Sequence, residues 1–482
     1  GTITRNISLL NENLLTYNFK IKQDHHFDLL FGLSFQKEQN YLNEGDATDG
    51  PNDYVHYATG LWGNGSGLIN MNNESDKDNN PVWQSAFNYK SSLEEQRMNS
   101  YFGRLRYDYR EKYLLETTIR RDGSSVFGED CRWATFPSVA VGWIFTEESF
   151  VKSLYWLSFG KIRVSWGQSG QKFSQPYLAH GLMSGSGTSI LGNQGMEPDS
   201  KGGALNRSLS WEKTDQYNIG LDLGLFNNKL TFAVDAYYKL TRDLLQQVKI
   251  APSTGFDTRL MNLGKVENKG IEFDINYKIF STKKLEWSVY ANGGINKNKL
   301  RSLGNRDYIQ GNTIGGVIAN RFMVGQPLGV FYGLRQKGIF KSWDQIRNSP
   351  DGIAQRNATP GEYIFENVHV DYVEDANENM VPSEKQVINE DDYTVIGDPN
   401  PDFVYAFGTD FKYKRFDFSI LFTGQVGGDI YWADYGVLTN MWRPYNMYAP
   451  AFENSWKAPL QYTVVDANGN AHVFGSTGNM SS

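Results

Sequence analysis

The sequence predicts an all-β protein, a transmembrane antiparallel β-barrel with long extracellular loops. The clearest evidence is residues 268–279, in which large apolar side chains alternate with charged and amide side chains. Successive side chains of a strand point to opposite faces, so this segment is a strand with one apolar and one polar face. Residues 285–296 return with the same alternation after a short turn. We interpret the pair as a barrel hairpin with lipid on one face and a wet lumen on the other.

Ten further segments show the same two-residue period, which gives about twelve strands in all. In chain order they are 15–21, 27–36, 101–110, 113–120, 133–145, 161–166, 216–225, 230–239, 403–413 and 416–423. The segment 133–145 has Trp133 and Trp143 towards its ends and valines between them, as two aromatic girdles around an apolar band would produce. Pro137 within it predicts an irregular or bulged position.

The connections between these segments are sorted by length. On one side they are tight, with a modest exception at 146–158; the tight ones are 22–26, 110–113, 225–229, 280–284 and 414–415. On the other side, long connections cover 39–96, 169–208 and 300–400. Bacterial barrels have short periplasmic turns and long extracellular loops, whereas a soluble sandwich has no reason to sort its loops. Within the last long connection we expect a hairpin near 328–340, and we expect loop after about residue 430.

Composition excludes several classes of protein. The longest apolar run, about 139–145, falls far short of the roughly 18 residues that a membrane helix needs, which excludes helical spans but not a barrel. The net charge of −7 disfavours nucleic acid as a partner. The single cysteine, Cys131, excludes an internal disulfide framework and a cysteine-based zinc site.

Alternation by itself also fits a secreted β-sandwich or a propeller, because their strands have one apolar face as well. No repeat of constant period is present, which weakens the propeller interpretation. The sorted loops and the Trp and Tyr residues at strand ends favour the barrel. A passive porin would share such a wall, so the porin, the sandwich and an adhesin remain alternatives at this point.

Seven stretches of the chain resemble the SusC-like (SusC/RagA) family of TonB-dependent outer-membrane transporters of Bacteroidetes. They occur in the order typical of the family and are 101–107, 113–128, 133–138, 142–143, 161–167, 262–272 and 396–403. The resemblance implies a 22-stranded barrel plugged by an N-terminal domain, with a SusD-like lipoprotein as a lid. It also implies import of oligosaccharides or peptides through the bacterial outer membrane with energy delivered by TonB.

The matching stretches all correspond to the barrel of such a transporter. We expect residues 1–482 to be part of the barrel of a longer transporter, with the plug domain, the TonB box and the C-terminal strands absent. TonB would then act through a region outside this chain. The partners expected are outer-membrane lipid, the lipoprotein and an oligosaccharide or peptide ligand, and the choice between the two ligand classes stays open.

Two sets of residues are candidates for functional roles. Charged side chains on the polar faces of neighbouring strands should form a ladder inside the barrel: Arg104, Arg106, Glu116, Arg120, Lys161 and Arg163. They could serve lumen solvation and cross-strand pairing, face the plug, or contact substrate. Aromatic side chains of the loops could contact a sugar or peptide, or pack within their own loops: Tyr54, Trp62, Trp83, Trp343, Trp432 and Trp442.

No enzyme constellation is evident, so we expect no catalytic residues, no cofactor and no metal site. The six histidines are scattered, and the pair His25-His26 fits a polar turn better than a metal pair. Residues 371–392 echo a stretch that looks like a calcium loop in relatives, but the alternating acidic pattern and central glycine are lost. We expect a solvated acidic loop there, and whether calcium binds stays open.

Overall fold

The computed structural model describes most of the wall and part of the long connections. It covers residues 2–47, 87–173, 204–254, 258–311, 317–355, 357–369 and 387–439, together with residue 256 and short pieces at 176–177, 179, 183–188, 194–198, 313–314, 372–374, 380–382, 448–453, 461–465 and 471–475. The chain divides into two compact units. Unit one comprises Gly1–Lys265 and Phe273–Ile279, and unit two comprises Val266–Glu272 and Phe280–Ser482.

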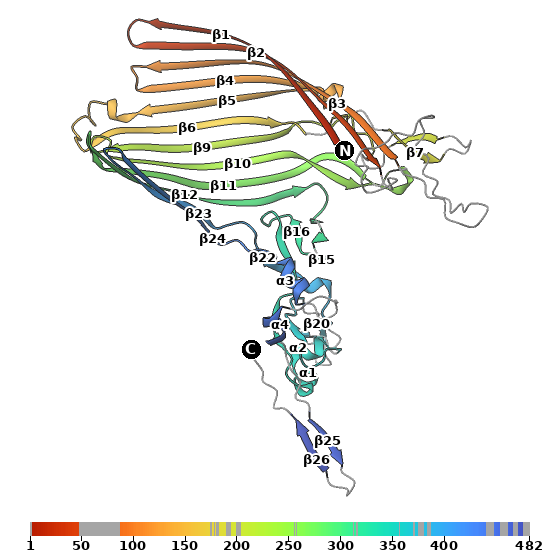
Figure 1. Cartoon of the computed structure of the whole chain (residues 1–482). Helices are drawn as coiled ribbons and strands as arrows, with labels where there is room; N and C mark the ends of the chain where they lie inside the picture. The colour runs from red at the N-terminus through yellow and green to blue at the C-terminus, as the bar shows by residue number, and fades with distance from the viewer. Residues whose placement is uncertain are drawn as a thin grey trace, which may run out of the picture. The chain divides into compact units, whose positions relative to one another are not determined.

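Twelve antiparallel strands form the main sheet, and they follow one another in the sheet as they do in the chain. They are β1 (Thr2–Ile21), β2 (His25–Ala47), β3 (Phe87–Tyr109), β4 (Tyr113–Ser124), β5 (Trp133–Ile144), β6 (Leu157–Gln171), β9 (Glu212–Leu225), β10 (Leu230–Lys249), β11 (Thr258–Ser281), β12 (Leu285–Leu303), β23 (Phe403–Tyr413) and β24 (Phe416–Val426). Figure 1 shows β1–β6, β9 and β10 of unit one as one row of neighbouring ribbons. This up-and-down order confirms the strand number and the all-β class predicted from alternation.

One face of unit one is covered with exposed apolar side chains. Val141 on β5 lies opposite Val164 on β6, and Val164 lies opposite Ile219 on β9. Each of these three side chains is more than half exposed. A contiguous exposed apolar row is costly in water, since burial of apolar area is the main favourable term in folding. The row is the surface that a lipid-facing barrel wall presents.

The strands β2 and β3 extend far beyond their apolar segments, so the prediction of loop throughout 39–96 is wrong at both ends. Residues up to Ala47 pair with residues from Phe87 onwards in unbroken register. Polar contacts join this extension: Gln39 donates to Glu95 (2.7 Å), and Lys37 lies 3.1 Å from the same carboxylate. A ribbon with water on both faces needs no apolar face, which is why alternation does not reveal it.

The expected irregularity at Pro137 is also wrong. Pro137 lies opposite Ile119 in a β4–β5 ladder without any register shift. The β5–β6 ladder begins only at Ser138. A proline is tolerated where the missing N–H faces no ladder partner, so the position at the start of one ladder explains it without a bulge. The strand ends at Ile144, and the expected strand residue Phe145 instead opens a single 3₁₀ turn.

The long connection in unit two contains small elements, but the hairpin expected near 328–340 is wrong. There β17 (Val330–Gly333) pairs with β16 (Asn320–Met323) and β22 (Thr394–Gly397), whereas β18 (Gln336–Ile339) pairs with β19 (Tyr363–Phe365). The remaining elements are β13 (Tyr308–Gln310), β14 (Thr313–Ile314), β15 (Val317–Ile318), β20 (Tyr372–Glu374), β21 (Met380–Pro382), and the helices α1 (Trp343–Asn348) and α2 (Pro350–Ala354).

The last part of the chain is not simply loop, contrary to expectation. It contains α3 (Ala433–Leu438), α4 (Ala449–Glu453) and the hairpin of β25 (Gln461–Val465) and β26 (Ala471–Gly475). Another small hairpin, in unit one, pairs β7 (Met183–Thr188) with β8 (Gln194–Pro198). Among the described residues, no helix is long and apolar enough to cross a membrane.

Candidate functional site: the charged face of unit one

The predicted charged ladder lies on one face of the sheet. The register places Arg106 between Asp28 and Glu116, and Arg104 between Leu30 and Thr118. The β5–β6 ladder pairs even with odd residue numbers, for example Gly142 with Arg163, so the odd-numbered Lys161 and Arg163 share this face with the even-numbered residues of β3 and β4. We call this surface the charged face. All six predicted residues (Arg104, Arg106, Glu116, Arg120, Lys161 and Arg163) lie on it.

Arg163 forms the strongest contact on the charged face. Its Nε and Nη2 donate to the two oxygens of Asp222 at 2.7 and 2.8 Å. Its Nη1 and Nη2 also donate to the two oxygens of Asp235 at 3.1 and 3.0 Å. Planar two-pronged pairing of this kind is the strong form of a charged hydrogen bond. We call it the Arg163 clamp, and it joins β6, β9 and β10.

Gly220 makes room for the clamp. It lies opposite Arg163 on one side and opposite Asp235 on the other. A Cβ at this position would lie 2.6 Å from Asp235 Oδ1 and 2.7 Å from Arg163 Nη2. Any larger residue would therefore displace the guanidinium, so the glycine belongs to the site. Sequence reasoning missed the glycine and the two aspartates as members of the site.

Other charged residues pair more weakly along the same face. Arg106 donates to Glu116 across the β3–β4 ladder, with both side chains about half exposed. Arg120 contacts the buried Asp122 at 2.8 Å and donates to Ser100 at 2.9 Å. Exposed pairs of this type contribute little stability by themselves, so their main effect is to hold the side chains in position.

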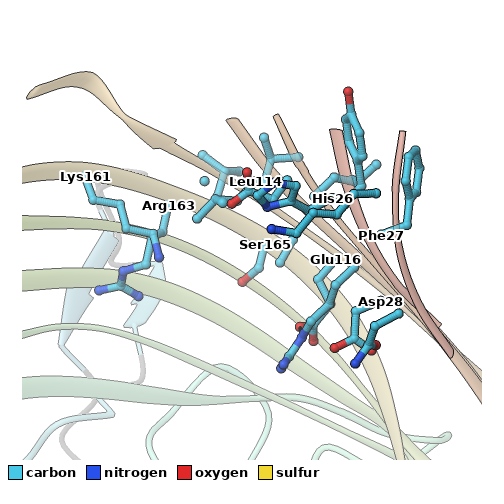
Figure 2. Close-up of a pocket in the computed structure, with 18 of the residues that line it drawn as sticks. His26, Phe27, Asp28, Leu114, Glu116, Lys161, Arg163 and Ser165 are labelled. Atoms are coloured by element: carbon cyan, nitrogen blue, oxygen red, sulfur yellow. Dashed lines mark hydrogen bonds and ion pairs between the residues drawn. The ribbon is translucent and has the colours of Figure 1, made fainter. Parts of the chain in front are cut away.

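A concavity of about 840 Å³ lies over the charged face towards the tight-turn end of the strands. Figure 2 shows Asp28, Glu116 and Arg163 on one side of the sheet and Phe27 on the other. The lining carries both signs of charge. Asp28 Oδ1 and Arg104 Nε on this face are buried and have no hydrogen-bond partner among the described residues. Buried polar atoms of this kind are normally paired, so the face offers hydrogen-bonding positions to whatever fills the space above it.

At the other end of the strands, an apolar cluster anchors the loops. Phe127 packs on Trp211 with ring centroids 4.7 Å apart, and Phe136 packs edge-on against the same indole at 5.7 Å. Trp211 is 2% exposed and donates to the carbonyl of Arg132 at 3.1 Å. Phe127 and Phe136 come from two of the stretches that carry the family resemblance. The structure thus assigns these stretches a packing role that alternation alone could not reveal.

The stretch 396–403 in unit two is connected by side-chain hydrogen bonds to Leu328 and to Asn298. Asn400 donates to Asp398 at 2.6 Å and to the carbonyl of Leu328 at 3.1 Å. Asn298 in β12 donates to Asn400 at 2.8 Å and accepts from the Leu328 amide at 2.6 Å. The two asparagine side chains therefore hydrogen-bond with both backbone groups of Leu328, and they hold the segment between β22 and β23 in place.

Four of the predicted loop aromatics, Tyr54, Trp62, Trp83 and Trp442, lie outside the described residues. Trp343 opens α1 and is 52% exposed, and Trp432 precedes α3 and is 63% exposed. Trp432 contacts Tyr435 with centroids 5.0 Å apart. No ring contact joins the two tryptophans in the part of the chain that the structure describes, so they do not form one platform.

An aromatic cluster that sequence reasoning missed surrounds Arg321 in unit two. The guanidinium carbon lies 4.2 Å from the Tyr332 ring centroid and 4.5 Å from that of Tyr308. A cation between two ring faces is a favourable cation–π arrangement. The three residues lie on three strands of the sheet β13-β16-β17-β22, so only their pairing brings them together.

The expected solvated acidic loop is wrong for Asp392. Its side chain is buried, and its carboxylate accepts hydrogen bonds from the backbone amides of Val368 (2.9 Å), His369 (3.0 Å) and Asn389 (3.0 Å). The last contact is half of a capping box at a 3₁₀ turn. This aspartate therefore holds the backbone of its own loop.

Ion pairs and a tyrosine hydrogen bond connect neighbouring turns outside the membrane-spanning segments. Arg110 donates to Asp24 at 3.0 Å, and this hydrogen bond lowers the pKa of the Asp24 carboxyl. Tyr113 donates to Glu148 at 2.7 Å and, aided by Lys112, lowers the pKa of that carboxyl. Both carboxylates are thus kept ionised while they join neighbouring turns.

An up-and-down antiparallel sheet with an exposed apolar face, a charged opposite face and sorted connections defines the wall of an outer-membrane β-barrel. Comparison with protein families agrees: residues 4–471 match the family "TonB dependent receptor-like, beta-barrel". The chain belongs to this family, which makes it an outer-membrane protein and excludes the secreted β-sandwich.

Named relatives make the match more specific. TonB-dependent receptor P26 of Formosa agariphila is 32% identical over 431 residues, which is 87% of this chain and 39% of the relative. TonB-dependent receptor SusC of Bacteroides thetaiotaomicron is 40% identical over 208 residues, 42% of this chain and 21% of that protein. These matches confirm the resemblance to SusC-like proteins. The chain spans about 39% of the length of the first of these relatives.

A solved structure shares the fold. The RagAB peptide transporter matches with a TM-score of 0.68 and 23% identity, over 88% of this chain and 42% of that one. At this identity, the match supports the architecture of the wall and is not evidence of a shared substrate.

Proposed function

We propose that the protein to which this wall belongs imports oligosaccharides or peptides across the outer membrane. Import would be energised through TonB and assisted by a SusD-like surface lipoprotein. The observation that carries the proposal is the family match over residues 4–471 together with the similarity to SusC. The choice between oligosaccharide and peptide stays open in this proposal, because the RagAB match supports the architecture alone and the name of SusC states no ligand.

The charged face would line the lumen. In this proposal the Arg163 clamp holds β6, β9 and β10 at fixed spacing, so the lumen keeps its shape while a domain moves within it. The buried unpaired atoms of Asp28 and Arg104 would hydrogen-bond with that domain or with lumen water. Most of the named charges on the charged face are paired with each other, so the face has little net charge. Such a wall would bind weakly to a domain that moves along it.

The long connections would receive the ligand. Trp343 and Trp432 are exposed and lie on the connection side of the strands in sequence, where rings could stack on sugar C–H groups or peptide side chains. The lipoprotein would cover the same end. TonB would act on a part of the transporter other than the wall, because the wall strands are held in a continuous sheet.

Affinity capture of the tagged full-length protein from outer membranes tests the proposal. We expect a SusD-like lipoprotein to co-purify, and we expect uptake of labelled oligosaccharide or peptide mixtures to stop when TonB is deleted. The passive-porin alternative makes the opposite prediction: a single purified protein that gives a stable open conductance in planar bilayers and uptake that is independent of TonB. That pair of results would overturn the proposal.

A further inference from the structure

A groove on the exposed apolar face of unit one has the features of a lipid site. It has a volume of about 700 Å³ and crosses β1 to β5. One row across the strands consists of Leu15, Phe31, Gly103 and Ile119, each opposite the next in register. Phe31 and Ile119 are both more than half exposed, and Gly103 between them has no side chain. The missing side chain is what makes the apolar surface concave here.

A cation lies at one end of the groove. The next row towards the long connections contains Leu33, Tyr101 and Arg121, again opposite one another. Tyr101 stacks on Trp133 with centroids 5.7 Å apart, and the Arg121 guanidinium lies 5.8 Å from the same indole. Among the described residues, no carboxylate lies within ion-pair distance of Arg121. The Arg121 guanidinium at the end of this groove is therefore available to an external anion.

The position of Arg121 along its strand fits the outer edge of the membrane. Tyr113 begins β4 beside a tight turn, and Arg121 follows eight residues later. At ~3.3 Å per residue and a tilt of ~40°, this corresponds to about 20 Å along the membrane normal, close to the height of the apolar band. Arginines at this level reach into the interface between acyl chains and headgroups.

We propose that the groove binds a phosphate-bearing lipid of the outer leaflet. One acyl chain would lie over Gly103 between Phe31 and Ile119, and the phosphate would accept hydrogen bonds from Arg121. The pairing of a guanidinium with phosphate is strong and geometrically specific. The inference rests on the assignment of the apolar face to lipid, and it is independent of what the transporter carries.

Native mass spectrometry of the full-length transporter tests the site. The probes are palmitoyl-oleoyl phosphatidic acid and the diacylglycerol with the same chains, which differ in the phosphate alone. We expect the wild type to retain phosphatidic acid preferentially, and Arg121→Gln to weaken that retention about tenfold, the effect of one charge-assisted hydrogen bond. Arg5→Gln, an exposed arginine on the same face of β1, is the matched control and should retain wild-type binding.

A second variant separates the acyl seat from the phosphate contact. Gly103→Leu should reduce retention of both probes because the side chain fills the groove. If it does not fold, Gly103→Ala replaces it, since a Cβ there makes an ordinary 3.7 Å contact with Phe31. Equal retention of the two probes by the wild type, equal loss in Arg5→Gln and Arg121→Gln, or unchanged binding in the Gly103 variants would each overturn the proposal. So would a mass showing a second protein copy in place of lipid.

Discussion

Removing the Arg163 clamp should destabilise the wall by more than the loss of one surface ion pair. Arg163→Met keeps an unbranched stem but removes the guanidinium, so Asp222 and Asp235 become two carboxylates without their shared cation. The three side chains are about a quarter to a third exposed. At about 1 kcal/mol for each pair, the expected loss is ~2 kcal/mol, above the 0–1 typical of exposed pairs and below the 3–5 of fully buried ones.

The assay is urea unfolding of the full-length protein in lipid vesicles, followed by the shift between folded and unfolded bands on a gel. Arg106→Met is the matched control on the same face, and it should lose less than about 1 kcal/mol because its one pair is half exposed. The neutral triple variant Arg163→Met, Asp222→Asn, Asp235→Asn should recover most of the loss, because no carboxylate is left unpaired. A triple variant as unstable as Arg163→Met alone would refute the electrostatic reasoning.

Three other predictions test separate parts of the structure. Ile275→Lys should impair assembly by roughly 2–4 kcal/mol if it meets lipid near the midplane, whereas Asn276→Lys should be tolerated; equal damage in a heat-modifiability gel would contradict the assignment of the two faces. Because the pKa of Asp24 is lowered, its ion pair contributes its full stability above the usual pKa of 3.8 and loses it as the pH falls through the lowered value. The difference in melting temperature between the wild type and Asp24→Asn should therefore be constant between pH 7 and 5 and vanish at lower pH. A difference that grows on acidification would show that the ion pair does not lower this pKa. Trp211→Ala should cost about 3–5 kcal/mol by leaving a cavity in the loop cluster, against ~0.5 or less for the exposed Tyr155→Ala; similar melting midpoints for the two would argue against the cluster as an anchor.

The sequence predicts well what is repeated along the chain. The two-residue period identifies all twelve strands of the sheet, because a wall between lipid and water needs one apolar and one polar face throughout its apolar band. For the same reason it predicts the face of each charged candidate, and the register places Arg106 opposite Glu116 on that face. The apolar pattern stops where the lipid stops, which is why the ribbon of β2 and β3 beyond Phe35 and Tyr101 was mistaken for loop.

Sites that depend on contacts between distant segments of the chain cannot be predicted from the two-residue period. The Arg163 clamp needs Gly220 on one neighbouring strand and Asp235 on the next, and no local pattern distinguishes this glycine from a turn residue. The Arg321 cluster and the burial of Asp392 likewise arise from segments that meet only after folding. The periodicity of a strand depends on the solvents at its two faces, whereas sites of this kind depend on which residues lie on the neighbouring strands.

The claim on which the rest depends is that the two faces of the strands meet different solvents. Spin labels placed one at a time along 271–279 of the full-length protein in vesicles measure this directly through collision with oxygen and with a water-soluble nickel complex. We predict high oxygen accessibility at odd positions and high nickel accessibility at even positions. Accessibility that does not alternate along the strand would contradict the membrane wall itself.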